Sequence, residues 1–162
     1  MMGKVKTAGE MAHLIAAARK EGRTVAMANG IFDLLHVGHV RYLQAAAAEA
    51  DVLVVAVNSD ASARGLKGEG RPIVPEQERA EVLAALACVD HVVIFGEATC
   101  DRLLELLKPD VHCKGTDYTK ESVPEAKTVR SFGGRIAIVG DPKQHATRDL
   151  IAAIRDVRLP RS

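Results

Sequence analysis

Two histidines three residues apart, His36 and His39, follow an apolar run and flank a glycine, Gly38. The run, residues 24–28, is rich in small and β-branched residues, which predicts a buried strand that turns at Asn29-Gly30 and leads into a helix. The first N–H groups of a helix lack partners and carry the positive end of its dipole, which suits a phosphate. Residues three apart share a helix face, and a glycine lets a ligand approach the backbone. The spacing therefore predicts a phosphate site with two imidazole donors.

Two histidines alone could equally be a metal pair or have no function, but their context is more specific. A strand, then N-G-x-F-D, then H-x-G-H opening a helix is typical of the nucleotidyltransferase superfamily that includes the cytidylyltransferases. It also resembles the HIGH element of class I aminoacyl-tRNA synthetases. The side chain of Asp33 either caps backbone amides and holds the turn or takes part directly in the chemistry. The first part of the motif consists of Asn29, Gly30, Ile31, Phe32 and Asp33.

Positively charged side chains are expected near the same place. Lys67 and Arg71 lie in residues 65–72, where three glycines and a proline predict a mobile loop, so they either close over a ligand or stay solvated. Lys114 directly follows an apolar strand and is expected in the site. Such a set suits nucleotidyl transfer, in which an anionic phosphate oxygen attacks the α-phosphorus of a nucleoside triphosphate and no general base is needed.

Other polar residues have two interpretations. Arg79 either adds positive charge to the site or pairs with Glu76 or Glu78 on its own helix. Asn58 and Asp60 follow a strand, where they either cap the next helix or bind substrate hydroxyls.

The elements that must position these residues alternate between strands and helices. Strands are expected at 24–28, 51–57, 91–95, 110–113 and 135–139. Helices are expected after Thr7, after the histidine motif, at 61–64, after Pro75, at 103–107 with Thr99 as the cap, at 123–132 and from Thr147. This alternation predicts an α/β, doubly wound, Rossmann-like domain with a five-stranded parallel sheet of order 3-2-1-4-5 and helices on both faces. Ligands bind beyond the carboxyl ends where the strand order reverses, which would bring His36, His39 and Lys114 together.

Composition narrows the class of protein. The 162 residues suit a single domain, and 22 Lys+Arg against 21 Asp+Glu give no general attraction to nucleic acid or membrane. Aromatic residues are few, so base-stacking platforms for single-stranded nucleic acid are not expected. No apolar stretch approaches the length of about 20 residues that a membrane span needs. Three widely spaced cysteines and a charged N-terminal stretch without a secretory pattern favour a cytoplasmic protein with reduced thiols, and Cys113 is expected in the core.

With these motifs, the chain resembles the adenylyltransferases that act on D-glycero-β-D-manno-heptose 1-phosphate, found alone or as the C-terminal half of a bifunctional kinase/adenylyltransferase. The resemblance covers almost the whole chain. It rests on NGIFDLLHVGHVRYL from Asn29, VAVNSDASARGLKGEGRPI from Val55, Glu78-Arg79, CVDHVVIF from Cys88 and PDVHCKGTDY from Pro109.

The resemblance implies that ATP and the sugar 1-phosphate give ADP-heptose and pyrophosphate, for the lipopolysaccharide core. Mg²⁺ would sit on the triphosphate without a protein ligand, and the protein would be a homodimer or larger. The catalytic residues would be His36, His39, Lys114 and Arg79. Nucleotide contacts would come from Asn29, Gly30, Ile31, Phe32, Asp33, Gly38, Lys67, Gly115, Thr147 and Arg148. From their polarity and position, we expect sugar-phosphate contacts from Asn58, Asp60, Arg71, Asp117 and Tyr118.

Two departures from the family pattern leave alternatives open. Thr116 replaces the second glycine of K-G-G-D-Y, and Ala146-Thr147-Arg148 replaces Ser-Thr-Thr before the last helix. Arg148 either compensates by charge for two lost hydroxyls or changes the nucleotide or sugar preference. The alternatives are a cytidylyltransferase of the glycerol-3-phosphate type, whose R-T-E-G-I-S-T element is missing here, and a non-catalytic nucleotide- or sugar-phosphate-binding module.

Overall fold

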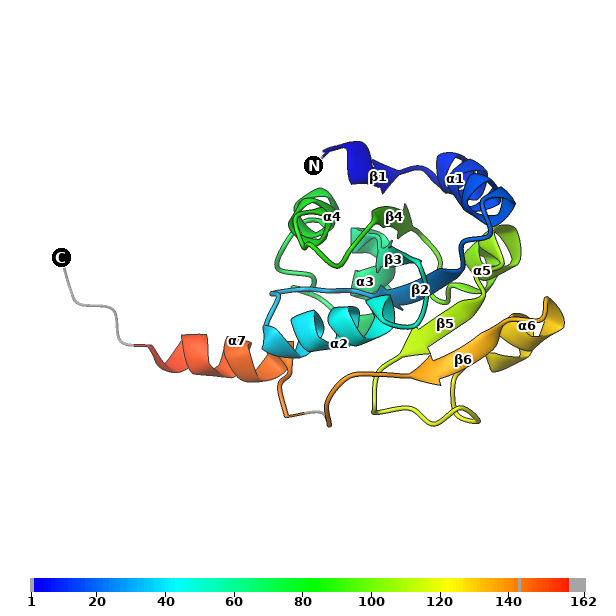
Figure 1. Ribbon diagram of the computed structural model, residues 1–162. Coiled ribbons are helices and arrows are strands. Elements are labelled where there is room, and N and C mark those ends of the chain that lie inside the picture. Colours follow the sequence, from blue (N-terminus) through cyan, green and yellow to red (C-terminus); the bar gives the residue numbers. More distant parts are fainter. Residues whose placement is uncertain (1, 143, 158–162) are drawn as a thin grey trace.

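A computed structural model describes residues 2–142 and 144–157 of the chain. Its centre is a parallel sheet of order β1-β4-β3-β2-β5-β6 (Figure 1). The strands are β1 (Val5–Lys6), β2 (Val25–Gly30), β3 (Val52–Asn58), β4 (His91–Phe95), β5 (Val111–Lys114) and β6 (Arg135–Ile138). The predicted order is confirmed for the five longer strands. The predicted number of strands was wrong, because β1 pairs with β4 through only two residues and is too short to show a strand pattern.

Seven helices accompany the sheet in the described residues: α1 (Ala8–Lys20), α2 (Val37–Ala47), α3 (Asp60–Lys67), α4 (Glu76–Ala84), α5 (Asp101–Leu107), α6 (Ala126–Ser131) and α7 (Thr147–Asp156), with a short 3-10 turn η1 (Met2–Lys4) before them. Helices α1, α5 and α6 pack on one face of the sheet and α2 and α4 on the other. Helices on both faces were predicted and are confirmed. In contrast, α7 extends away from this body and buries none of its residues (Figure 1).

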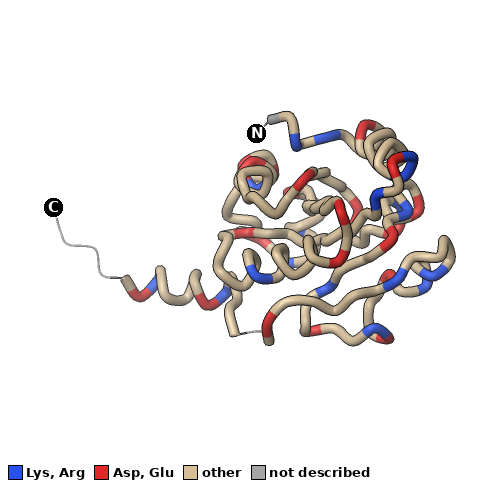
Figure 2. Tube along the Cα trace, in the orientation of Figure 1, with Lys and Arg blue, Asp and Glu red and all other residues tan. Residues whose placement is uncertain are grey.

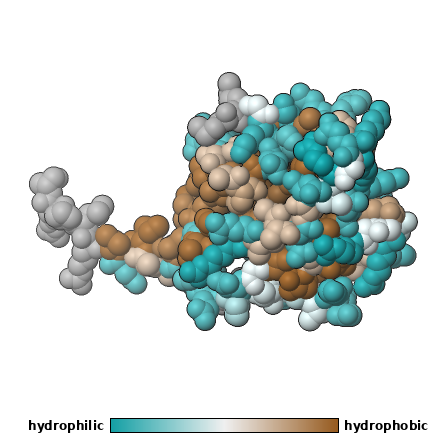
Figure 3. Space-filling model, in the orientation of Figure 1, coloured by the Kyte–Doolittle hydropathy of each residue, from teal (hydrophilic) through white to brown (hydrophobic). Residues whose placement is uncertain are grey.

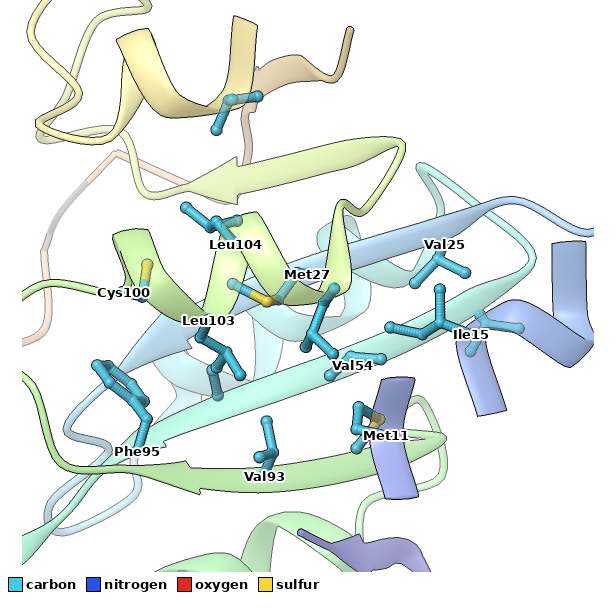
Figure 4. Close-up of a cluster of buried hydrophobic side chains, with 14 of the residues drawn as sticks. Met11, Ile15, Val25, Met27, Val54, Val93, Phe95, Cys100, Leu103 and Leu104 are labelled. Carbon is cyan, nitrogen blue, oxygen red and sulfur yellow. The ribbon is translucent and has the colours of Figure 1, made fainter. Parts of the chain in front are cut away.

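Two apolar clusters, one on each face, hold the layers together. All seven residues of β3 are buried, as the unbroken apolar run predicted for a central parallel strand. On the first face, Met11 and Ile15 of α1 and Leu104 of α5 belong to one buried apolar cluster with Met27 of β2 (Figure 4). The sheet is thus covered on both faces, and the loops at its carboxyl end stand on this core.

Helix starts were predicted with mixed success. Thr7 and Glu10 form the expected capping box, in which each side chain accepts the other's backbone N–H. The Thr99 cap was wrong: α5 starts after Cys100, and the Thr99 hydroxyl instead donates to the Asp101 side chain at 2.7 Å.

Helix α3 was expected only at 61–64, but it runs from Asp60 to Lys67. The glycine-rich connection is therefore shorter than predicted, and Lys67 is the last helical residue.

Charged residues of both signs are spread over the chain (Figure 2). No helix in the described part of the chain has the length and apolar character to cross a membrane.

Candidate active site

A cavity of about 850 Å³ opens at the carboxyl end of the sheet, between β2 and β5. This is where the predicted strand order reverses, and His36, His39 and Lys114 all line it. Most of the other predicted site residues line it too: Asn29, Gly30, Ile31, Phe32, Asp33, Gly38, Asn58, Lys67, Arg71, Gly115, Asp117, Tyr118, Thr147 and Arg148. These predicted residues come from five separate segments (29–39, 58, 67–71, 114–118 and 147–148), which thus converge on one cavity.

The two histidines cap the helix that carries them. The Nδ1 atom of His36 accepts the N–H of Gly38 at 3.1 Å, and the Nδ1 atom of His39 accepts the N–H of His36 at 3.3 Å. This is a capping box in which imidazoles replace the usual hydroxyl and carboxylate. A ring nitrogen that accepts an N–H bond carries no proton, so each neutral imidazole carries its proton on Nε2. The backbone therefore selects the tautomer with Nε2–H as donor.

Gly38 makes room for the first of these rings. The imidazoles of His36 and His39 stack with centroids 3.9 Å apart. A Cβ added to Gly38 would lie 2.9 Å from both Cε1 and Nδ1 of His36, closer than real contacts allow. The sequence predicted that this glycine lets a ligand approach the backbone. The structure shows that it lets the His36 ring lie over the backbone.

Lys114 enters the cavity from β5, the neighbour of β2. Its side chain is almost buried, and its Nζ lies 3.3 Å from Oδ1 of Asn29 and 3.6 Å from Oε2 of Glu125. The ammonium also lies 4.7 Å from the centre of the Tyr118 ring. These contacts position one cation beside the turn that carries the histidines.

Asp33 joins this turn to the segment after α3. Its carboxylate accepts hydrogen bonds from Arg71 Nε at 2.8 Å and from the N–H groups of Ile73 and Val74 at 2.9 and 3.0 Å. Burial alone would raise the pKa of Asp33, but these donors outweigh it and lower the pKa below its usual value. Its carbonyl oxygen also accepts the Thr147 hydroxyl at 3.0 Å. Of the two interpretations offered, the capping one describes these contacts.

Arg79 and Asp60 were predicted site residues, but neither lines the cavity. Arg79 is 2% exposed and pairs with Asp60 at 2.8 Å, not with Glu76 or Glu78. Its guanidinium also donates to the carbonyl oxygens of Val74 and Asn58, both at 2.9 Å, and of Ile31. The side chain thus ties the ends of β2 and β3 to the start of α4, which is a structural task.

Several cavity residues were not predicted. Tyr42 donates its hydroxyl to the Cys113 carbonyl at 2.8 Å, and burial raises its pKa well above the usual value. His145 lies with its ring 6.3 Å from that of His36. The sequence around His145 has no helix or strand period, so only its place before the last helix could have indicated that it lies at the site. Glu125 was also missed: it falls inside the helix predicted at 123–132, whereas α6 begins at Ala126 and leaves Glu125 in front of it, where it lines the cavity.

A family model described as cytidylyltransferase-like matches residues 27–152. The chain therefore belongs to the cytidylyltransferase-like family. Among individual relatives, it is 50% identical over 151 residues to the bifunctional protein HldE of Geobacter metallireducens and 48% identical over 151 residues to that of Geobacter sulfurreducens. Each match covers 93% of this chain and 31% of the relative, so the chain spans about a third of the length of these curated relatives.

Solved structures give the same fold. A lipopolysaccharide core biosynthesis protein from Thermoplasma volcanium superposes with a TM-score of 0.65 at 29% identity, covering 75% of this chain and all of that one. Pantothenate synthetase from Thermus thermophilus superposes with a TM-score of 0.61 over 84% of this chain and 61% of that one. At 20% identity, the second likeness concerns the fold alone.

Proposed function

We propose that residues 1–162 act as a single nucleotidyltransferase domain that transfers AMP from ATP to D-glycero-β-D-manno-heptose 1-phosphate, giving ADP-heptose and pyrophosphate. The observation that carries the proposal is the pair of backbone-held imidazoles, His36 and His39, in one cavity with the Lys114 ammonium. The similarity to HldE proteins and to a lipopolysaccharide core biosynthesis protein supports this choice of substrates. Because ATP is the donor, we expect the reaction in the cytoplasm.

In this mechanism the sugar phosphate is its own nucleophile. One of its anionic oxygens attacks the α-phosphorus of ATP, the bond to the β-phosphate oxygen breaks, and pyrophosphate leaves with the electron pair. The Nε2–H groups of His36 and His39 donate to the phosphate oxygens on which charge develops, and Lys114 adds a positive charge. Both donors are already oriented before substrate binds, because the backbone holds each ring through Nδ1.

The cavity suits a nucleotide that brings its own Mg²⁺. Of the four carboxylates among the described residues that line the cavity, Asp33 is occupied by Arg71 and two backbone N–H groups, Glu125 lies beside Lys114, and Asp141 pairs with Arg41; the fourth is Asp117. Mg²⁺ is commonly held by substrate phosphates with few protein ligands. When bound to the triphosphate, it would neutralise part of the charge on the oxygens. Asn58, Arg71, Asp117 and Tyr118 remain the proposed partners of the sugar phosphate.

We also expect the protein to form a homodimer or a larger homo-oligomer. Leu150 and Ile154 are exposed on α7, which extends away from the sheet and shows an apolar side (Figure 3). Light scattering of the wild-type protein and of an Ile154→Glu variant would test this. A monomeric wild-type protein would contradict the expectation.

The substrate proposal is tested by offering Mg²⁺ with either ATP or CTP to a panel of sugar and alcohol phosphates and measuring pyrophosphate. Release with ATP and the heptose 1-phosphate supports it. Release with CTP and glycerol 3-phosphate would favour a cytidylyltransferase. Tight nucleotide binding without release would favour a non-catalytic binding module.

The role of the imidazoles is tested by His39→Ala. Loss of one donor to a developing oxyanion typically lowers turnover by about 10²-fold or more, and we expect that effect here. His13→Ala is the control, because His13 is exposed on α1 and lies outside the cavity. Unchanged turnover in a folded His39→Ala variant would contradict the mechanism.

A further inference from the structure

A second group of reactive side chains lies behind the cavity. Cys100 precedes α5, His112 lies within β5, and Glu125 precedes α6. All three are buried, with exposed fractions of 0%, 0% and 3%. One sulfur, one ring nitrogen and one carboxylate oxygen lie within 4.8 Å of one another, and in the described ranges no other three ligands of these types meet this way. Of the three residues, Glu125 alone lines the cavity.

Three polar atoms of this group lack hydrogen-bond partners. Neither ring nitrogen of His112 has one, and Oε2 of Glu125 has none either. The nearest groups to Oε2 are Nε2 of His112 at 3.7 Å and Nζ of Lys114 at 3.6 Å, while the Cys100 thiol reaches Oε1 at 3.6 Å. A buried polar atom without a partner costs about 1–3 kcal/mol, so several together call for a missing ligand.

We propose that Cys100, His112 and Glu125 form a binding site for a transition-metal ion of the Zn²⁺ class. Thiolate, imidazole and carboxylate are the three protein ligand types of Zn²⁺, whereas Mg²⁺ and Ca²⁺ take oxygen ligands. Each residue comes from a different segment, two of them beside helix starts and one in the sheet. A bound metal would therefore fasten α5 and α6 to β5, next to Lys114.

Binding requires a proton to leave. Burial raises the pKa of the Cys100 thiol, so the neutral S–H form is the resting state. On binding, the S–H bond breaks, the sulfur electron pair goes to the metal, and the proton goes to solvent. Glu125 is already ionised: although burial opposes this, His112 and Lys114 hold its pKa at about 2.

The neighbouring ammonium does not forbid the metal. Lys114 lies 3.6 Å from Glu125, and a second cation nearby must be balanced. The dication and the ammonium face a thiolate and a carboxylate, which leaves one net positive charge. That charge would border a cavity built for phosphates, where it is tolerated.

The test is a titration of tag-free protein, stripped with a chelator, with Zn²⁺ and with Co²⁺. We expect one ion bound per chain, a thiolate-to-cobalt charge-transfer band and a higher melting temperature with Zn²⁺. In calorimetry, the measured binding heat should vary with the ionisation heat of the buffer, because a proton is released on binding. Cys100→Ser should weaken Zn²⁺ binding by about 100-fold and abolish the band. Cys88→Ser should change neither, since Cys88 lies outside the group.

A second variant keeps the proposal testable if Cys100→Ser does not fold. His112→Leu replaces the unpartnered ring by an apolar side chain, so it should lose the metal while the metal-free protein stays as stable as wild type. Absence of stoichiometric binding in the wild type would overturn the proposal. Equal binding by His112→Leu and wild type, or by Cys100→Ser and Cys88→Ser, would also overturn it.

Discussion

Adding one methyl group at Gly38 should remove most of the activity without unfolding the protein. The Cβ of Gly38→Ala would lie 2.9 Å from two atoms of the His36 ring, and ordinary contacts begin at 3.4 Å, so the ring must retreat by about 0.5 Å (3.4 minus 2.9). The retreat also weakens the 3.1 Å hydrogen bond from the Gly38 N–H that holds Nδ1. Because one misplaced oxyanion donor costs about 10²-fold, we expect turnover to fall by about that factor.

The stability of the same variant should change little. Alanine in a helix is favoured over glycine by about 0.5–1 kcal/mol, and loss of the cap costs about the same, so the two effects nearly cancel. Gly9→Ala is a matched control, because Gly9 is the second residue of α1 as Gly38 is of α2. No heavy atom lies within 4 Å of a Cβ at Gly9, so this change should leave turnover intact.

The assay is pyrophosphate release under saturating ATP and sugar phosphate, with thermal unfolding followed by circular dichroism. Full turnover in Gly38→Ala would refute the claim that the position of the His36 ring matters. Loss of turnover in Gly9→Ala as well would show that a glycine-to-alanine change lowers activity in some other way.

Three further changes probe the surrounding contacts. Asp33→Asn should lower the free energy of unfolding by about 2 kcal/mol at pH 7. The folded protein lowers the pKa of Asp33, so the wild-type carboxylate loses its stabilising effect as pH falls through that folded pKa. The stability difference between Asp33→Asn and wild type should therefore shrink below about pH 4. A difference that stays constant with pH in urea unfolding would contradict this prediction. Arg79→Lys should cost about 3 kcal/mol, because one ammonium cannot serve three carbonyl groups and Asp60, whereas the exposed Arg64→Lys should cost nothing measurable by the same method. Lys114→Gln should lower turnover by about 10²-fold, and wild-type turnover would exclude Lys114 from the mechanism.

The sheet was predictable because its strands carry unbroken apolar runs. The runs at β2 and β3 indicated buried parallel strands, and right-handed crossovers with one reversal then favoured the order that the structure shows. Strand β1 was not predictable, since two residues show no period. Side-chain competition hid the start of α5, where Thr99 bonds Asp101 instead of a backbone N–H.

The site was predictable only where topology brings residues together. His36, His39 and Lys114 follow from strand ends that adjoin at the reversal. Whether an arginine is buried depends on partners from distant segments, so the Arg79 contacts could not be predicted. Its four-residue spacing from the buried Leu83 places both on one helix face, which was the available sign.

The histidine capping box has a consequence for attempts to redesign this protein. The atoms that would handle phosphate belong to the same rings that close the entry of α2, so a replacement at position 36 or 39 alters reactivity and local folding together. Neither property can be optimised alone by a single substitution there. A designer would first have to supply a new acceptor for each of the two backbone N–H groups.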